Sequence, residues 1–210
     1  MRAAHQLMAK QGVDATTIQQ ITEAADVGFG TFYNYFTSKD DLATQVLDCV
    51  IHNLGQRNDL VTQAKHIDDP VLIVATSVRL VARELMTDSM WQWWVKRPDL
   101  VVARMRVGFR PFGMRDMRRA MDAGEYHIVG DDMDTAWSFL IWLLAGGVKD
   151  IIDGYRPPVI ESLIVDAVMR IMGVSRERAE QVTRIPLPPY PSLDIDFSFV
   201  LEAEPADAAA

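Results

Sequence analysis

Residues 16–42 of the chain read Thr16-Thr-Ile-Gln-Gln-Ile-Thr-Glu-Ala-Ala-Asp-Val-Gly-Phe-Gly-Thr-Phe-Tyr-Asn-Tyr-Phe-Thr-Ser-Lys-Asp-Asp-Leu42. Thr16 followed by Gln19 is a capping-box pattern, which predicts a helix over 17–25. The residues at 26–28 predict a short turn, and another helix is expected over about 29–36. Two helices joined by a turn of about three residues are typical of a helix-turn-helix.

The second of these helices is too short to serve only as core. Its Phe32 and Phe36 are expected to point inward and hold the three N-terminal helices together. The opposite face carries groups that can hydrogen-bond to base edges and phosphates. These are Thr31, Tyr33, Asn34 and Tyr35. The alternative is that the two tyrosines are ordinary surface aromatics of a small helical domain.

Over residues 3–48 the chain resembles the TetR family of helix-turn-helix transcriptional regulators. The resemblance rests on a helix ending at Gly12, the Thr-Thr pair at 16–17, Gly-Thr-Phe-Tyr-x-x-Phe at 30–36 and Ser-Lys-x-x-Leu at 38–42. It implies an all-α fold, with a three-helix head joined to a helical body for ligand binding and dimerisation. It also implies a homodimer that binds palindromic double-stranded operator DNA and responds to a small-molecule effector. The single cysteine favours a reduced, cytoplasmic compartment.

The resemblance also implies roles for individual residues of the head. Thr16 and Thr17 cap the second helix and face a phosphate, Tyr33 meets a phosphate, and Lys39 pairs with another. Phe29 either contacts a thymine methyl group or covers the core of the head. The implied DNA-binding set is Thr16, Thr17, Gly28, Phe29, Gly30, Thr31, Tyr33, Asn34, Tyr35 and Lys39.

The charge of the head departs from this pattern. The whole chain has 21 basic and 29 acidic residues and a net charge of −8, which argues against a protein that coats DNA by bulk charge. Residues 1–50 hold three basic and six acidic side chains, and the family's usual basic N-terminal arm is missing. Either operator affinity is modest and salt-sensitive, or the sequence lacks an arm. The alternative function is a dimeric helical ligand-binding protein with weak or lost DNA binding.

Helical patterns continue through the rest of the chain. We expect a head over 1–48, a ligand-binding and dimerisation domain over 49–184, and a proline-rich acidic tail over 185–210 that packs against the other parts. The single cysteine, Cys49, excludes an intramolecular disulfide. The sequence contains no run of about 18 uncharged apolar residues, so no membrane span is predicted. The four histidines are scattered, and no acid, base and nucleophile set suggests an enzyme, so no metal or cofactor is expected.

All five tryptophans lie in the body. The run Trp91-Gln-Trp-Trp94 cannot face one core, because adjacent helical residues are about 100° apart. We therefore expect a cavity rich in aromatic and methionine side chains, with ordinary core packing as the alternative. The predicted ligand-binding residues are Trp91, Trp94, Met105, Phe109, Arg110, Met114, Trp137 and Phe139.

Residues 96–119 carry eight basic side chains and two acidic ones. Arginine binds carboxylates and phosphates through two parallel hydrogen bonds. We therefore expect Arg104, Arg106 or Arg110 to meet the anionic head of a hydrophobic or amphipathic ligand, such as a coenzyme A thioester, that releases the protein from DNA. A solvated helix face is the alternative.

The helix expected over 131–153 is apolar almost all round, so it must be covered on several sides. A second apolar stripe follows over 158–172. We expect the two helices to form a four-helix dimer interface with a second copy, and the alternative is monomer core. The predicted interface residues are Trp137, Leu140, Leu144, Val148, Ile160, Leu163, Ile164, Ala167 and Ile171.

Overall fold

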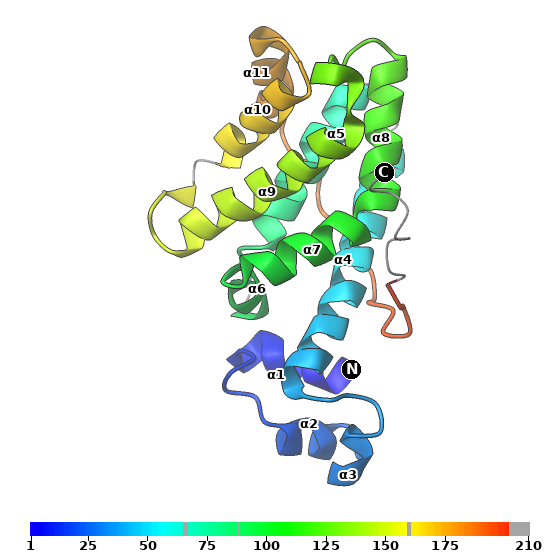
Figure 1. Ribbon diagram of the computed structural model, residues 1–210, viewed down its shortest axis with the longest axis vertical. Helices are drawn as coiled ribbons and strands as arrows, with labels where there is room; N and C mark the ends of the chain where they lie inside the picture. The colour runs from blue at the N-terminus through cyan, green and yellow to red at the C-terminus, as the bar shows by residue number, and fades with distance from the viewer. Residues whose placement is uncertain (65–66, 88, 159–160, 202–210) are drawn as a thin grey trace.

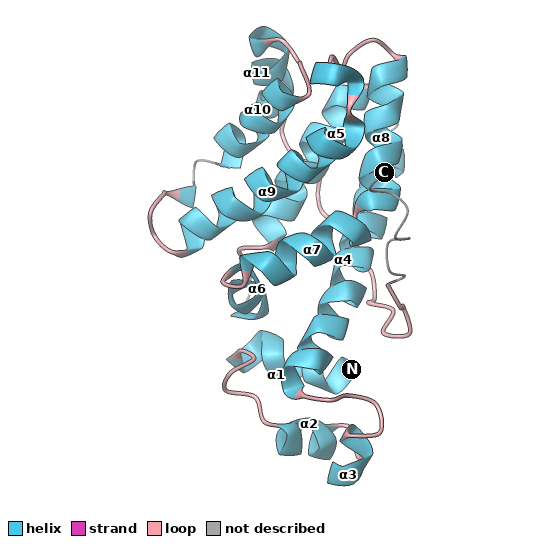
Figure 2. Cartoon of the chain, in the orientation of Figure 1, coloured by secondary structure: helices cyan, strands magenta, loops and turns pink. Residues whose placement is uncertain are grey.

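The computed structural model describes residues 1–64, 67–87, 89–158 and 161–201, and within these ranges the chain is helical with no strand (Figure 2). A small head of three helices lies at one end, and the long helix α4 (Lys39–Ala64) runs from it into a larger helical body (Figure 1). The predicted all-α fold is confirmed.

The head consists of α1 (Arg2–Gln11), α2 (Ile18–Ala24) and α3 (Phe29–Phe32). The capping box of α2 is formed one residue later than predicted. The Thr17 hydroxyl accepts from the Gln20 amide at 3.1 Å, and the Gln20 side chain accepts from the Thr17 amide at 2.9 Å. Thr16 cannot take this place, because it is fully buried and its hydroxyl donates to the Gly12 carbonyl at 2.7 Å.

The helix α3 is shorter than the predicted 29–36. Beyond Phe32 the backbone tightens, and the amides of Asn34 and Tyr35 donate to the carbonyls three residues before them. The buried Phe32 ring lies 5.4 Å from the Phe36 ring and anchors this turn. The two inward-facing phenylalanines therefore behave as predicted, although the helix itself ends early.

The body contains seven further α-helices within the described residues. They are α5 (Pro70–Glu84), α6 (Ser89–Val95), α7 (Pro98–Gly108), α8 (Arg110–Asp122), α9 (Met133–Ile152), α10 (Glu161–Ile171) and α11 (Arg176–Arg184), with a 3-10 turn at Val129–Asp131 before α9. The Asp69 carboxylate caps α5 by accepting from the amides of Val71 and Leu72, as the Asp-Pro pair predicts. Helix α9 packs on α7 and α10, and α5 packs on α8 and α10.

Several ion pairs join helices of the body. Glu161 of α10 accepts from Arg79 at 3.3 Å and from Arg83 at 2.7 Å, both on α5. Asp48 of α4 accepts from Arg104 of α7, with 2.6 Å between Nε and Oδ1. Burial raises the pKa of Asp48, and the Arg104 hydrogen bonds oppose this shift.

By length and composition, α9 could cross a membrane, and it is the one such helix in the described part of the chain. A core helix of a soluble protein meets the same criterion. The side chains of Trp137, Ile141 and Leu144 of α9 are buried in the body.

After α11 the chain turns back along α4 toward the head, as the orange to red segment in Figure 1. The prediction that the tail packs against the rest of the protein is confirmed for residues 185–201.

Candidate nucleic-acid interface and ligand cavity

The outer end of the head carries large aromatic side chains in solvent. Phe29 is 54% exposed, Tyr33 54% and Tyr35 72%, although each is large and apolar enough to be buried. The Phe29 and Phe32 rings lie 5.8 and 5.2 Å from the Tyr33 ring, both in edge-on geometry. The buried Phe32 therefore fixes the base of this aromatic surface while the tyrosine hydroxyls remain available.

Most of the predicted DNA-binding residues surround this surface. Thr17, Gly28, Gly30 and Asn34 are exposed, and Thr31 is half-buried. They lie at the start of α2 and in or directly beside α3, and these two helices lie at one end of the head (Figure 1).

Two predicted DNA-binding residues are used differently. Thr16 is fully buried, so it cannot offer its side chain to a phosphate. The ammonium of Lys39 donates to the carbonyls of Val13, Asp14 and Thr16 at 2.7, 3.2 and 2.8 Å. A lysine has three N–H donors. Lys39 therefore fastens the loop before α2 to the start of α4, and a phosphate would have to displace one of these bonds.

The body contains a cavity between α4, α5, α8 and α9, with about 550 Å³ of empty space including the open solvent at its mouth. Its wall is mainly apolar. The apolar side chains come from α5, from α8 with the residue before it, and from α9: Val74, Val78, Val81, Phe109, Phe112, Met117, Trp137, Leu140, Ile141 and Leu144.

Two glycines allow the aromatic rings of this wall to lie against the helices. A Cβ on Gly55 of α4 would lie 2.2 Å from the Phe112 ring. A Cβ on Gly113 of α8 would lie 2.2 Å from the Trp137 ring. The Trp137 indole N–H donates to the Arg106 carbonyl at 3.0 Å, so this ring is held in place.

Among the described residues, four polar side chains line the cavity, and the two carboxylates among them, when ionised, can only accept hydrogen bonds. The four are Asn58 and Asp59 on α4, Ser77 on α5 and Asp116 on α8. Arg115 donates to Asp116 at 2.9 Å and to Asp59 at 2.5 and 3.1 Å. Burial raises the pKa of Asp116 despite the Arg115 hydrogen bond. Two carboxylates and one guanidinium leave a net negative site, which suits a ligand that donates hydrogen bonds.

The structure places only Phe109 and Trp137 of the predicted ligand-binding residues in this wall. Trp91, Trp94 and Met105 are buried elsewhere in the core, and Met114 is half-buried outside the lining. Phe139 points away from the cavity, being 53% exposed on α9. Helical periodicity alone did not indicate which buried aromatic residues border a cavity.

The predicted anion-binding arginines also lie outside the lining. Arg104 pairs with Asp48, and Arg110 pairs with Asp134 at 2.6 Å. The Arg106 backbone carbonyl, instead, accepts the Trp137 indole bond. Part of the basic cluster therefore joins helices, because Arg104, Arg110 and Arg115 each pair with a carboxylate on another helix.

The predicted dimer residues fall on two different faces. Trp137, Leu140, Leu144 and Val148 are at most 3% exposed, and Ile164 is also buried, so these side chains belong to the core of the protomer. Ala167 and Ile171 are half-buried, and Ile160 lies outside the described residues. Of the predicted set, Leu163 is strongly exposed, at 66%.

The exposed apolar side chains of α9 are Phe139 and Trp142, with Gly146 exposed one turn further along. Their spacing of three and four residues puts all three on one side of the helix. The face predicted for dimerisation is therefore corrected: the stripe starting at Trp137 is inside, and the stripe starting at Phe139 is outside.

Family models match most of the chain. Residues 1–46 match the model for bacterial regulatory proteins of the tetR family, and residues 69–184 match a tetracyclin repressor-like C-terminal domain. The chain belongs to the TetR family.

Individual TetR-family relatives agree with this assignment. The HTH-type transcriptional regulator AcrR of Shigella flexneri is 31% identical over 83 residues, which is 40% of this chain and 38% of the relative. The alignment therefore spans well under half of that curated relative. The solved structure of RolR in complex with resorcinol has a TM-score of 0.82 and 27% identity, covering 90% of this chain and 93% of RolR. RolR without ligand gives a TM-score of 0.80 at the same identity.

The connection between the TetR-type head and the body includes a residue that the sequence did not single out. The Trp93 indole N–H donates to the Asp14 carboxylate at 2.7 Å, and Arg97 lies over the Trp93 ring at 3.5 Å. The Ser89 hydroxyl of α6 also donates to the Ala9 carbonyl of α1 at 3.2 Å. The sequence feature that could have indicated Trp93 is the run Trp91–Trp94, whose side chains cannot all face one core. The Trp93 side chain of this run faces the head.

Proposed function

We propose that the protein is a dimeric transcriptional repressor that binds palindromic operator DNA through α3 and is released when a small ligand enters the cavity. The observation that carries this proposal is the exposed aromatic and amide surface of Phe29, Tyr33, Asn34 and Tyr35 at the tip of a TetR-type head. An α-helix fits the major groove, and a dimer supplies two such helices for two half-sites.

The ligand proposed for the cavity is a small, mainly apolar molecule with hydrogen-bond donors. The apolar wall would enclose a ring, and the oxygens of Asp116, Asn58 and Ser77 would accept from hydroxyl groups. A ligand carboxylate is disfavoured, because two carboxylates already lie in the wall. RolR, whose solved complex contains resorcinol, supports this class, since resorcinol is an aromatic ring with two hydroxyl groups.

The proposed dimer forms through the exposed stripe Phe139, Trp142 and Gly146 of α9 together with Leu163 of α10. Helices α9 and α10 pack on each other, so the two stripes belong to neighbouring elements. The same two helices in a second copy would complete a four-helix interface.

Fluorescence anisotropy with DNA from upstream of the protein's own gene tests the DNA-binding part. We expect affinity that falls steeply with salt, and a clear loss of affinity in Tyr33→Ala. The matched control is Tyr155→Ala, which removes a 75% exposed tyrosine from the body. Equal affinity for both variants, or no binding at low salt, would contradict this part of the proposal. Such a result would favour the alternative, a dimeric ligand-binding protein that has lost DNA binding.

Calorimetric titration with resorcinol, phenol and benzoate tests the ligand class. We expect the two phenols to bind more tightly than benzoate, and Asp116→Asn to weaken the binding of resorcinol. Tighter binding of benzoate would restore the anionic ligand and refute this part of the proposal.

A further inference from the structure

The segment that follows α11, residues 185–201, lies outside both matched family regions. It is fastened to the rest of the chain along its whole length. The Arg79 guanidinium donates to the Ile185 carbonyl at 2.6 Å, and the Arg57 side chain donates to the Pro191 carbonyl at 2.8 Å. The Asn53 amide donates to the carbonyls of Leu193 and Asp194 at 3.1 and 3.2 Å.

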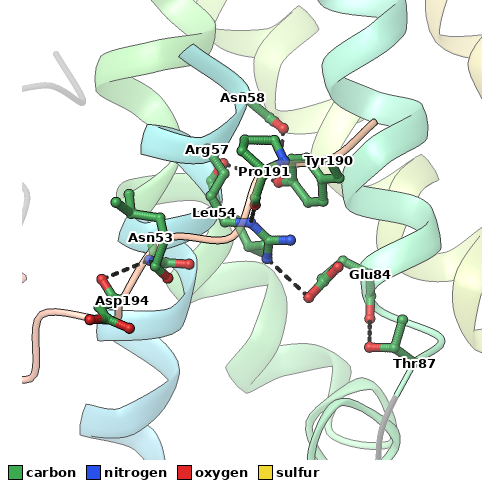
Figure 3. Close-up of polar contacts among 10 residues, drawn as sticks. Asn53, Leu54, Arg57, Asn58, Glu84, Thr87, Tyr190, Pro191 and Asp194 are labelled. Carbon is green, nitrogen blue, oxygen red and sulfur yellow. Dashed lines mark hydrogen bonds and ion pairs between the residues drawn. The ribbon is translucent and has the colours of Figure 1, made fainter. Parts of the chain in front are cut away.

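One attachment reaches the cavity wall. The Tyr190 hydroxyl lies 2.9 Å from the side-chain oxygen of Asn58 and 3.3 Å from the Leu54 carbonyl, as Figure 3 shows. The Arg57 guanidinium stacks over the Tyr190 ring at 3.8 Å and pairs with Glu84 at 3.1 Å. Asn58 itself lines the cavity, so this hydrogen bond joins the cavity wall to the segment.

A second attachment approaches the cavity through aromatic rings. The Phe199 ring stacks on His52 with 3.9 Å between centroids and nearly parallel planes. His52 lies 6.0 Å from Phe112, which lines the cavity. The Phe199 carbonyl also accepts a weak bond from the Cys49 thiol at 3.6 Å.

Between these two attachments the same segment touches the head. The Phe197 ring lies 5.5 Å from the His5 ring, and the Arg2 guanidinium lies 5.4 Å from the centre of the Phe197 ring. Both partners belong to α1, which packs on α2. The tail therefore contacts the cavity wall and the head within about ten residues.

We propose that residues 185–201 act as a strap that couples the wall of the ligand cavity to the position of α1. The strap is anchored at Asn58 through Tyr190 and at α1 through Phe197. A ligand that shifts Asn58 or Phe112 displaces the strap, and the displaced strap changes the orientation of the head. The regulatory meaning of this link rests on the proposed function, whereas the mechanical link does not.

Hydrogen–deuterium exchange on the full chain tests the link without DNA or ligand. The readout is the exchange rate of α1, and the exchange rate of α10 reports on global stability. Phe197→Ala should make α1 exchange about fivefold faster, because the cation–π contact between Arg2 and the Phe197 ring is lost together with its packing. Val200→Ala, in the same segment but 78% exposed, is the matched control and should leave α1 unchanged.

The decisive variants break the strap at the cavity end. Tyr190→Phe and Asn58→Ala each remove one partner of the same hydrogen bond, so each should speed α1 exchange and the double variant should add little. Faster α1 exchange with unchanged α10 exchange supports the strap. Wild-type α1 exchange in Tyr190→Phe overturns it, because Phe197 would then be only a local contact. Unchanged operator binding in Tyr33→Ala would contradict the proposed function alone and would leave this exchange result unaffected.

Discussion

Replacing Gly113 by alanine should destabilise the protein although alanine is the better helix former. The added Cβ would lie 2.2 and 2.5 Å from two atoms of the Trp137 ring, about 1 Å inside the 3.4 Å at which ordinary contact begins. The ring cannot move away freely. Its side chain is 3% exposed, and its indole N–H is bonded to the Arg106 carbonyl.

The magnitude follows from two opposing effects. Forcing one extra carbon into a packed core costs about 1–3 kcal/mol. Alanine is favoured over glycine in a helix by about 1 kcal/mol. Gly30→Ala isolates the second effect, because no neighbouring atom lies within 4 Å of the added Cβ and Gly30 lies in α3 of the head, away from the proposed dimer face. Relative to Gly30→Ala, Gly113→Ala should therefore be less stable by about 1–3 kcal/mol.

Urea denaturation followed by far-ultraviolet circular dichroism measures this difference, with both variants at the same protein concentration. The slope of the free energy of unfolding against urea should be the same for the two proteins, so that the midpoints report stability. Because Gly113 and Trp137 both line the cavity, the same variant should also bind resorcinol more weakly. If Gly113→Ala is as stable as Gly30→Ala, then α8 and α9 are not in close contact at Gly113 and Trp137.

Three further predictions concern the dimer face, the head and a buried carboxyl group. Phe139→Asp should shift the protein toward monomer in sedimentation velocity, whereas Tyr155→Asp should not; a dimer that survives the first change would exclude this face. Lys39→Met should destabilise the head by about 1.5–3 kcal/mol, because charged hydrogen bonds are lost, while Lys10→Met on the exposed side of α1 should have little effect; equal thermal melts would contradict this. The raised pKa of Asp116 means that the folded protein holds its proton to higher pH than the unfolded chain, so stability falls as pH rises above the usual carboxyl pKa. The free energy of unfolding of the wild type minus that of Asp116→Asn, measured by urea denaturation between about pH 4 and 7, should fall as the pH rises. A difference that rises with pH would refute this prediction.

The head could be predicted closely from the sequence because its signals are local. A threonine cap, an acidic first turn of α4 and inward phenylalanines at 32 and 36 act within a few residues of each other. The errors in this part were small: the helix cap is Thr17 instead of the predicted Thr16, and α3 ends at Phe32 instead of Phe36. Lys39 was different, because its three carbonyl partners lie more than twenty residues earlier in the chain.

The sequence by itself determined the all-α class, the helix-turn-helix head, the tail and the apolar character of α9 and α10. Only the tertiary structure decided which side of α9 faces inward, because a helix that is apolar nearly all round has no polar face to fix its rotation. Long-range packing against α7 and α10 buries Trp137 and leaves Phe139 outside. The cavity, its acceptor groups and the tail's path from Asn58 to α1 depend on the same long-range contacts, which no local pattern encodes.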